Sequence, residues 1–360
     1  MAAWNLEWFA VGLATYVGRR TRRSSGVVVV PLFARRYRRG RHDRQSEPRA
    51  MRRYPRRIII TDLPEALHLL RGDTMGKKAQ AGKPKKLTPK DVGKRINALV
   101  KNLEEELEGG DLFAPLPPTE DCAICLVPLS HVKAETFYQT CCGNEICWAC
   151  ANENHESIQK QNEENDGKKL VITCPFCREP NPTSDEEYLR QLQARCLQGD
   201  QNAFTLMGDL YQMGGCDVAK DDLKALDCFI RAVELGSPEA CVSIGTSYTE
   251  GNGVSVDKEK AAFFRRVGAL RGDIVARFNI GCSEYELGNH EIGIRHWKIA
   301  AEAGYQHSLD ALKKIYNADG RMPGKEFISQ EEMNTVYRSG HDAQMEIKTE
   351  EREKYKPMHM

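Results

Sequence analysis

The chain has 360 residues, which leaves room for two to three folded units at about 150 residues per domain. Hydrophobic residues make up 41% of it, enough for a sizeable core, and the formal net charge is +1. That charge averages two unlike parts, because residues 1–101 carry 25 Lys and Arg against 7 Asp and Glu, which excludes one evenly mixed globule.

Residues 1–87 are expected to form a basic, largely disordered arm and linker. The longest apolar stretch near the start, residues 8–17, is 10 residues long. A transmembrane helix needs about 20, so no transmembrane span is expected. The stretch is followed by arginines, whereas a signal peptide carries its positive charge ahead of the apolar part. The alternatives are an Arg-rich organelle transit segment or an untranslated upstream extension, with Met51 or Met75 as the start.

Nucleic acid is not an expected partner of the basic arm. Residues 35–57 are able to contact phosphates, but only Tyr37 and Tyr54 are available to stack on bases. Such binding would show as steeply salt-dependent retention on DNA or RNA that is lost on deleting residues 1–101. The expected location is the cytoplasm or the nucleus, with organelle targeting by the arm as the alternative.

Residues 88–110 predict an amphipathic helix. Thr88 is suited to cap its start, Pro89 to occupy the first helical position, and Asp91 to lie near its positive end. Gly109 and Gly110 end it. The apolar residues at helical spacing are Val92, Ile96, Leu99, Val100, Leu103 and Leu107. We expect the helix to dock on a neighbouring domain; the alternative is pairing with a second copy.

Eight of the 13 cysteines lie in the 56 residues from Cys122 to Cys177, arranged as four close pairs. Close pairs in a long chain indicate metal binding in a reducing compartment rather than a secreted disulfide framework. A C-x-x-C turn suits zinc because both sulfurs reach one ion at about 2.3 Å. The short gap between the second and third pairs favours an interleaved arrangement, with pairs one and three on one zinc ion and pairs two and four on another. Each bound zinc supplies roughly 10–16 kcal/mol to a small domain of this kind.

The pattern of cysteines over residues 119–182 resembles a RING-type zinc finger. The resemblance rests on Cys122-Ala-Ile-Cys125, on Cys142-Gly-Asn-Glu-Ile-Cys147 and on Cys174-Pro-Phe-Cys177-Arg178. It implies two cross-braced zinc ions on a small ββα scaffold that binds a ubiquitin-conjugating enzyme and promotes ubiquitin transfer to a lysine. The implied zinc ligands are Cys122, Cys125, Cys141, Cys142, Cys147, Cys150, Cys174 and Cys177.

One departure concerns the eighth ligand. The family's usual histidine is replaced by Asn144, which is a poor zinc ligand, so Cys141 beside Cys142 is expected to complete an all-cysteine site. His155 is the alternative eighth ligand.

The resemblance also implies roles for five other residues. Ile124, Pro175 and Phe176 would contact the conjugating enzyme, and Trp148 would add to that surface. Arg178 matches the linchpin arginine that bridges ubiquitin and the conjugating enzyme, a role that suits a planar guanidinium with five donors. The alternatives are plain packing residues and a solvated charge.

A second departure weakens the resemblance in the helix after the sixth cysteine. Many members carry a bulky apolar residue there, where this chain has Asn152, Asn154 and His155. The insert before Cys174 is rich in Gln, Asn, Glu and Lys and predicts an extended helix or a flexible loop.

Residues 188–320 predict a short α-solenoid of helix pairs. Gly208, Gly245 and Gly281 recur at intervals of 37 and 36 residues, and Gly214-Gly215 or Gly251-Asn252-Gly253 mark the turn inside a unit. The units resemble Sel-one-like repeats, which are related to tetratricopeptide repeats and bind proteins. We count three units and a partial fourth. The other five cysteines and the histidines of this part are expected to be ordinary packing or polar residues.

The expected fold is therefore mainly α: a disordered basic arm, a small two-zinc RING domain, a helical solenoid, and an acidic, frayed tail over residues 321–360. The expected function is a RING-type ubiquitin ligase that positions the thioester of a conjugating enzyme, while its repeats recruit a substrate or an adaptor. The alternative is a zinc-stabilised interaction scaffold without transfer activity.

Overall fold

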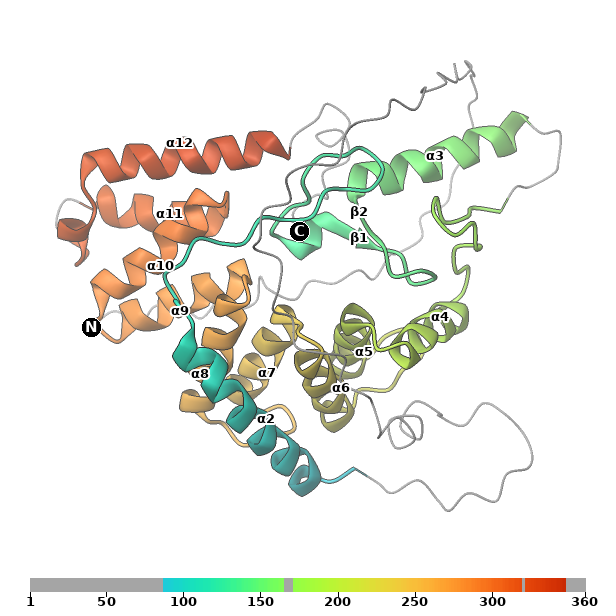
Figure 1. Ribbon diagram of the computed structural model, residues 1–360, viewed down its shortest axis with the longest axis horizontal. Coiled ribbons are helices and arrows are strands. Elements are labelled where there is room, and N and C mark those ends of the chain that lie inside the picture. The colour runs from blue at the N-terminus through green and yellow to red at the C-terminus, as the bar shows by residue number, and fades with distance from the viewer. Residues whose placement is uncertain (1–86, 165–170, 319–320, 348–360) are drawn as a thin grey trace, which may run out of the picture.

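The computed structural model describes residues 87–164, 171–318 and 321–347. A curved row of helices runs from α4 to α12, and a small cysteine-rich module with β1, β2 and α3 lies against its start (Figure 1). The expectations for the basic arm, and for the parts of the insert and tail at 165–170 and 348–360, lie outside the described residues.

Helix α2, Pro89–Gly109, has the predicted bounds. The Thr88 side chain caps its start by accepting a hydrogen bond from the Asp91 backbone N–H. Its buried face packs against α6 and α8, so it docks on the helical array and not on the cysteine-rich module that follows it in sequence. The Arg271 guanidinium binds both carboxylate oxygens of Glu106 at 2.8 Å, which fixes the same face.

The cysteine-rich module, residues 119–182, has little regular structure. A short helical turn η2, Lys133–Glu135, precedes the strands β1, Thr136–Tyr138, and β2, Glu145–Cys147. The strands are antiparallel, with Phe137 opposite Ile146, and β2 continues directly into α3, Trp148–Glu164. Among the module's described residues, the buried apolar side chains apart from cysteine are few: Leu129, Ile146 and Ala149.

The helical array is built from antiparallel helix pairs. Its helices are α4 Asp185–Leu197, α5 Gln201–Met213, α6 Asp222–Glu234, α7 Pro238–Glu250, α8 Lys258–Leu270, α9 Ile274–Glu286, α10 His290–Glu302 and α11 Gln306–Tyr316. Asp or Ser side chains cap the starts of α4 to α9, which defines each helix locally. The predicted small residues matter for packing: the ring of Phe229 lies where a side chain on Gly208 would stand. The expected helix pairs are therefore present.

The end of the chain corrects one expectation. The tail was expected to fray, but Gln330–Glu346 forms helix α12, which packs against α10. Ser329 and Glu332 form a reciprocal capping box at its start, and Met333 and Val336 are buried. The Glu-rich composition of this segment indicates a solvated tail, but its apolar residues recur at helical spacing and cover one face of the helix. A second short turn, η3 Lys325–Phe327, leads into α12.

Candidate metal centre

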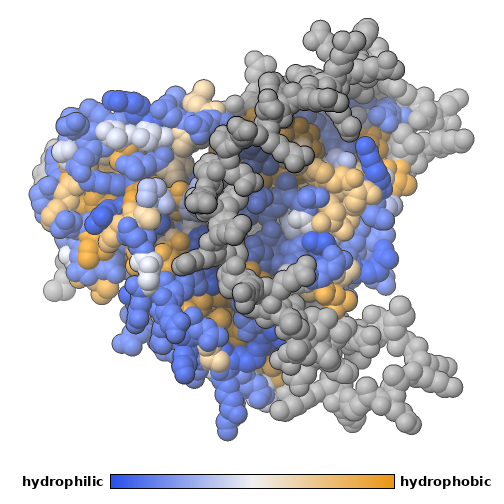
Figure 2. Space-filling view, viewed as in Figure 1, coloured by the Kyte–Doolittle hydropathy of each residue, from blue (hydrophilic) through white to orange (hydrophobic). Residues whose placement is uncertain are grey.

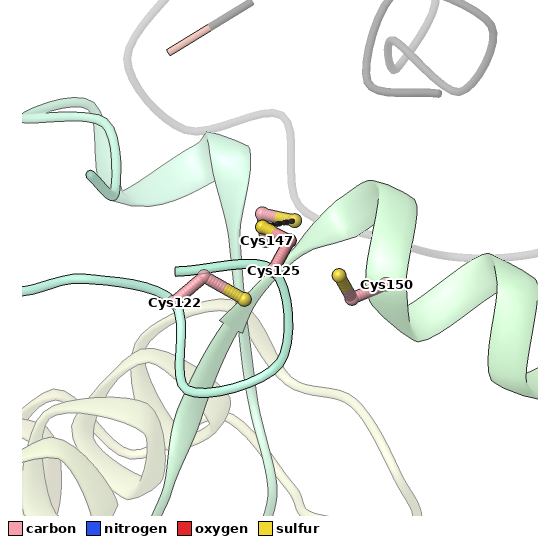
Figure 3. A group of neighbouring side chains, drawn as sticks. All are labelled: Cys122, Cys125, Cys147 and Cys150. Atoms are coloured by element: carbon pink, nitrogen blue, oxygen red, sulfur yellow. Dashed lines mark hydrogen bonds between the residues drawn. The ribbon is translucent and has the colours of Figure 1, made fainter. Parts of the chain in front are cut away.

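Four cysteines from two separate segments form a first cluster: Cys122, Cys125, Cys147 and Cys150. Figure 3 shows their sulfurs turned toward a common centre between the loop after Cys122 and the start of α3. The sulfurs lie within 4.8 Å of one another, and those of Cys125 and Cys147 are 3.9 Å apart. The first and third pairs thus share one centre, as the interleaved arrangement predicts.

The second cluster consists of Cys141, Cys142, Cys174 and Cys177, also within 4.8 Å of one another. The sulfur of Cys142 lies 3.7 Å from that of Cys174, and the sulfurs of Cys141 and Cys177 are 3.4 Å apart. His155 is in neither cluster; its Nε2 lies 3.5 Å from the Gln159 amide nitrogen on α3. The geometry therefore favours Cys141 over His155 as the eighth metal ligand.

Both clusters fit a tetrahedral metal ion. Four thiolates at about 2.3 Å from a zinc ion stand about 3.8 Å from one another. Three sulfur pairs lie 3.4 to 3.9 Å apart, and all pairs within a cluster are within 4.8 Å. Burial, and next the neighbouring thiols, raise the pKa of Cys141 and of Cys150, because burial disfavours the charged form and nearby thiolates repel it. A divalent cation removes that repulsion. The donor set therefore fits zinc, because zinc is one of the metals that soft thiolate ligands select.

The two C-x-x-C loops that open and close the module have the same local structure. The residue after each second cysteine is left-handed, with φ of 58° at Leu126 and 64° at Arg178. Its backbone N–H donates to the carbonyl of the first cysteine, from Leu126 to Cys122 at 2.8 Å and from Arg178 to Cys174 at 3.1 Å. This turn lets both sulfurs of a pair face one point.

The residues expected to contact a conjugating enzyme have different environments. Ile124 is 42% exposed, whereas Phe176 packs against the module's core. Trp148 meets the Phe137 ring edge-on, with centroids 5.0 Å apart. Pro175 is half-buried. Leu126, directly after Cys125, is 75% exposed and has the same place in its loop as Arg178 has in the other.

Arg178 is exposed, and within the described residues its guanidinium makes no hydrogen bond or ion pair. Asn154 lies in the part of the helix where many RING domains have a bulky apolar residue. Its side-chain amide donates a hydrogen bond to the Thr173 carbonyl at 3.1 Å. Asn144, in place of the usual histidine, donates to the Cys142 sulfur at 3.2 Å.

Apolar residues reach the surface over the module in Figure 2, whereas the outer side of α12 is largely hydrophilic.

One histidine of the array is not the ordinary polar residue we expected. His296 is 2% exposed and stacks on Phe113 with ring centroids 4.8 Å apart. Burial, and next the charges of Arg277 and Arg295, lower its pKa to about 4. The helical spacing of α10 places this residue on the buried face, with Gly293, Trp297 and Ala300. The cysteines Cys196, Cys228 and Cys241 are core residues, as expected.

Comparisons with known proteins address the helical array. Residues 205–237, 238–272 and 275–305 match the family model of the Sel1 repeat. These segments are Sel1 repeats. Each match begins within or next to the first helix of a pair and ends after the second. Three of the predicted units are confirmed, and the predicted partial fourth lies beyond the matches. Stacked Sel1 repeats present extended concave surfaces and imply protein partners. No family match covers the cysteine-rich module.

Two of the similar solved structures are described as a Sel1 repeat protein and as a protein with an SLR fold. A Sel1 repeat protein from Oxalobacter formigenes is 28% identical, with a TM-score of 0.38, over 54% of this chain and 75% of its own. A protective antigen of uropathogenic Escherichia coli with an SLR fold is 17% identical, with a TM-score of 0.38, over 69% of this chain and 50% of its own. The comparison with curated proteins gives no match. Among the described residues, no helix is both long and apolar enough to cross a bilayer.

Proposed function

We propose that the protein is a zinc-dependent RING-type ubiquitin ligase whose Sel1 repeats recruit a substrate or an adaptor protein. The observation that carries the proposal is the pair of interleaved four-cysteine clusters beside an exposed apolar residue, Ile124, and an unengaged arginine, Arg178. The eight cysteines would hold two zinc ions, whose role is to fix the two loops that carry these side chains.

The chemistry assigned to this chain is orientation, since no nucleophile is required of it. The substrate lysine amine attacks the thioester carbonyl on the conjugating enzyme, an isopeptide bond forms, and the enzyme's thiol leaves. Ile124 would supply apolar contact to the conjugating enzyme. The Arg178 guanidinium would donate to carbonyl groups of ubiquitin and of the conjugating enzyme together, which holds the thioester in a reactive geometry.

The array supports the recruiting half of the proposal. Three Sel1 repeats and α11 and α12 form a continuous helical surface, and arrays of this kind bind proteins along it. The substrate or adaptor would therefore be a protein held beside the module that positions ubiquitin.

A ubiquitination assay with zinc-loaded protein and a panel of conjugating enzymes tests the proposal. We expect ubiquitin chains with the wild type, and a loss of about tenfold or more with Arg178→Ala or Ile124→Ala. The matched controls are Arg266→Ala, an exposed arginine on α8, and Ile292→Ala, which is also 42% exposed but lies on α10. Activity that survives both module substitutions contradicts the assigned roles.

A second candidate is a zinc-stabilised interaction scaffold without transfer activity. Asn154 favours it, because a polar side chain bonded to the Thr173 carbonyl replaces the apolar residue with which many RING domains grip their partner. If zinc-loaded wild type gives no transfer with any conjugating enzyme of the panel, the scaffold function replaces the ligase.

A further inference from the structure

Helix α4 of the array reaches the two loops that carry the second cluster, residues 140–144 and 174–180. The Thr140 hydroxyl donates to Gln191 Oε1 at 2.6 Å, and Gln191 Nε2 donates to the Pro180 carbonyl at 3.2 Å. Thr140 directly precedes Cys141, and Pro180 follows Cys177 by three residues. A single carboxamide from the array therefore joins both loops.

A second side chain of α4 acts one turn later. The guanidinium of Arg195 lies where a side chain on Gly143 would stand, directly beside Cys142. Its Nε donates to Asp200 Oδ2 at 3.0 Å, and the same oxygen accepts the Tyr138 hydroxyl at 2.8 Å. The side chains of Arg195 and Asp200 are 20% and 11% exposed, so these charge-assisted bonds are largely shielded from water. The loop of Cys141 and Cys142 is thus hydrogen-bonded to α4 at Thr140 and packed against Arg195 at Gly143.

The second cluster has more need of such support than the first. Three of the four cysteines in the first cluster are buried, whereas in the second Cys177 is exposed and Cys141 and Cys142 are half-buried. Groups that hold metal-ligand loops in place are typically worth about 10- to 100-fold in metal affinity.

We propose that Gln191 and Arg195 are positioning residues for the metal ion of the second cluster, so that the first helix of the array completes the outer shell of that site. This inference rests on the zinc assignment of the proposed function, but not on ubiquitin transfer. By linkage, binding of the second ion and docking of α4 on the module favour each other by the same coupling free energy.

The test uses the full chain loaded with zinc and follows zinc loss to a chromophoric chelator. Alkylation of the released cysteines, read by mass spectrometry, tells the two clusters apart. We expect Gln191→Ala to release the second ion about tenfold faster and to leave the first unchanged. The control is Gln193→Ala on the same helix, whose amide makes no hydrogen bond among the described residues and which should behave as wild type.

Thr140→Val removes the same bond from the module side with little change in volume, and it covers the case in which Gln191→Ala folds poorly. We expect it to speed release from the second cluster, and the double variant to add little to either single one. Equal release rates in wild type and variants, or equal acceleration at both clusters, overturns the positioning role alone. Wild type that binds fewer than two ions overturns the metal assignment, and the positioning role with it.

Discussion

The cysteine-rich module and the helical array are stabilised by different means. Within its described residues the module buries little apolar surface beyond its cysteines, whereas the array buries large side chains such as Phe229, Phe264 and Ile244 completely. A domain of about 60 residues with so small a core needs an additional source of stability, and two bound metal ions would supply it. The comparison teaches that the array should fold without metal, and that the module should not.

Metal removal is the strongest test of this difference. With excess chelator we expect the module to unfold, because each structural zinc contributes roughly 10–16 kcal/mol, while the helices α5 to α11 persist. Circular dichroism should keep most of the helical signal, and limited proteolysis should cut within residues 119–182. Unfolding of the whole chain in one transition, or a module that stays protected, contradicts the comparison.

A substitution in the array tests the opposite case. Phe229 is completely buried, so Phe229→Ala should lower the free energy of unfolding of the array by about 3–5 kcal/mol. Denaturant unfolding followed by circular dichroism measures this, and Phe229→Leu should cost less because it leaves a smaller cavity. Two bound zinc ions should remain under native conditions. Their loss would mean that the regions depend on one core.

The smallest expected effect is a change of stability with pH. It arises at His296 of α10, which stacks on Phe113 in the segment between α2 and the module. His296 has a pKa of about 4 when folded and about 6.5 when unfolded, so the unfolded chain binds the proton more readily and stability falls as pH falls through this range. Between pH 7 and 4.5 the loss amounts to about 2–3 kcal/mol, and His296→Phe should abolish it.

Urea unfolding of both forms at the two pH values measures that difference. The comparison with His296→Phe is needed because burial, and next the charge of Glu239, raise the pKa of Asp209 and of Asp273 to about 7, which stabilises the fold as pH falls. An equal pH dependence in wild type and variant would contradict the assignment to His296.

Local patterns predicted most of the elements. The cap at Thr88 and the apolar spacing gave α2 its bounds, and the lengths of the gaps between cysteine pairs gave the grouping of the two clusters. The recurrence of Gly208, Gly245 and Gly281 gave the repeats. Each of these patterns is contained in one short segment or in a strict period, so no knowledge of the three-dimensional packing was required.

Contacts between distant segments were not predictable in this way. Gln191 is one of several polar residues on α4, and nothing in its own segment indicates that Thr140 and Pro180 lie beside it. Likewise, the docking of α2 on α6 and α8 depends on how the array curves back toward the start of the chain. Helix α12 was missed because an acidic composition outweighed a few apolar residues at helical spacing.

The position of α2 also has a consequence for synthesis on the ribosome. Its apolar face is completed by α6 and α8, and the start of α8 follows the end of α2 by about 150 residues. At roughly 5–20 residues per second, α2 waits about 8–30 s for the start of α8. During that interval Ile96 and Leu99 lack the partners that bury them in the folded array, so the nascent chain carries an apolar surface of the kind that favours aggregation.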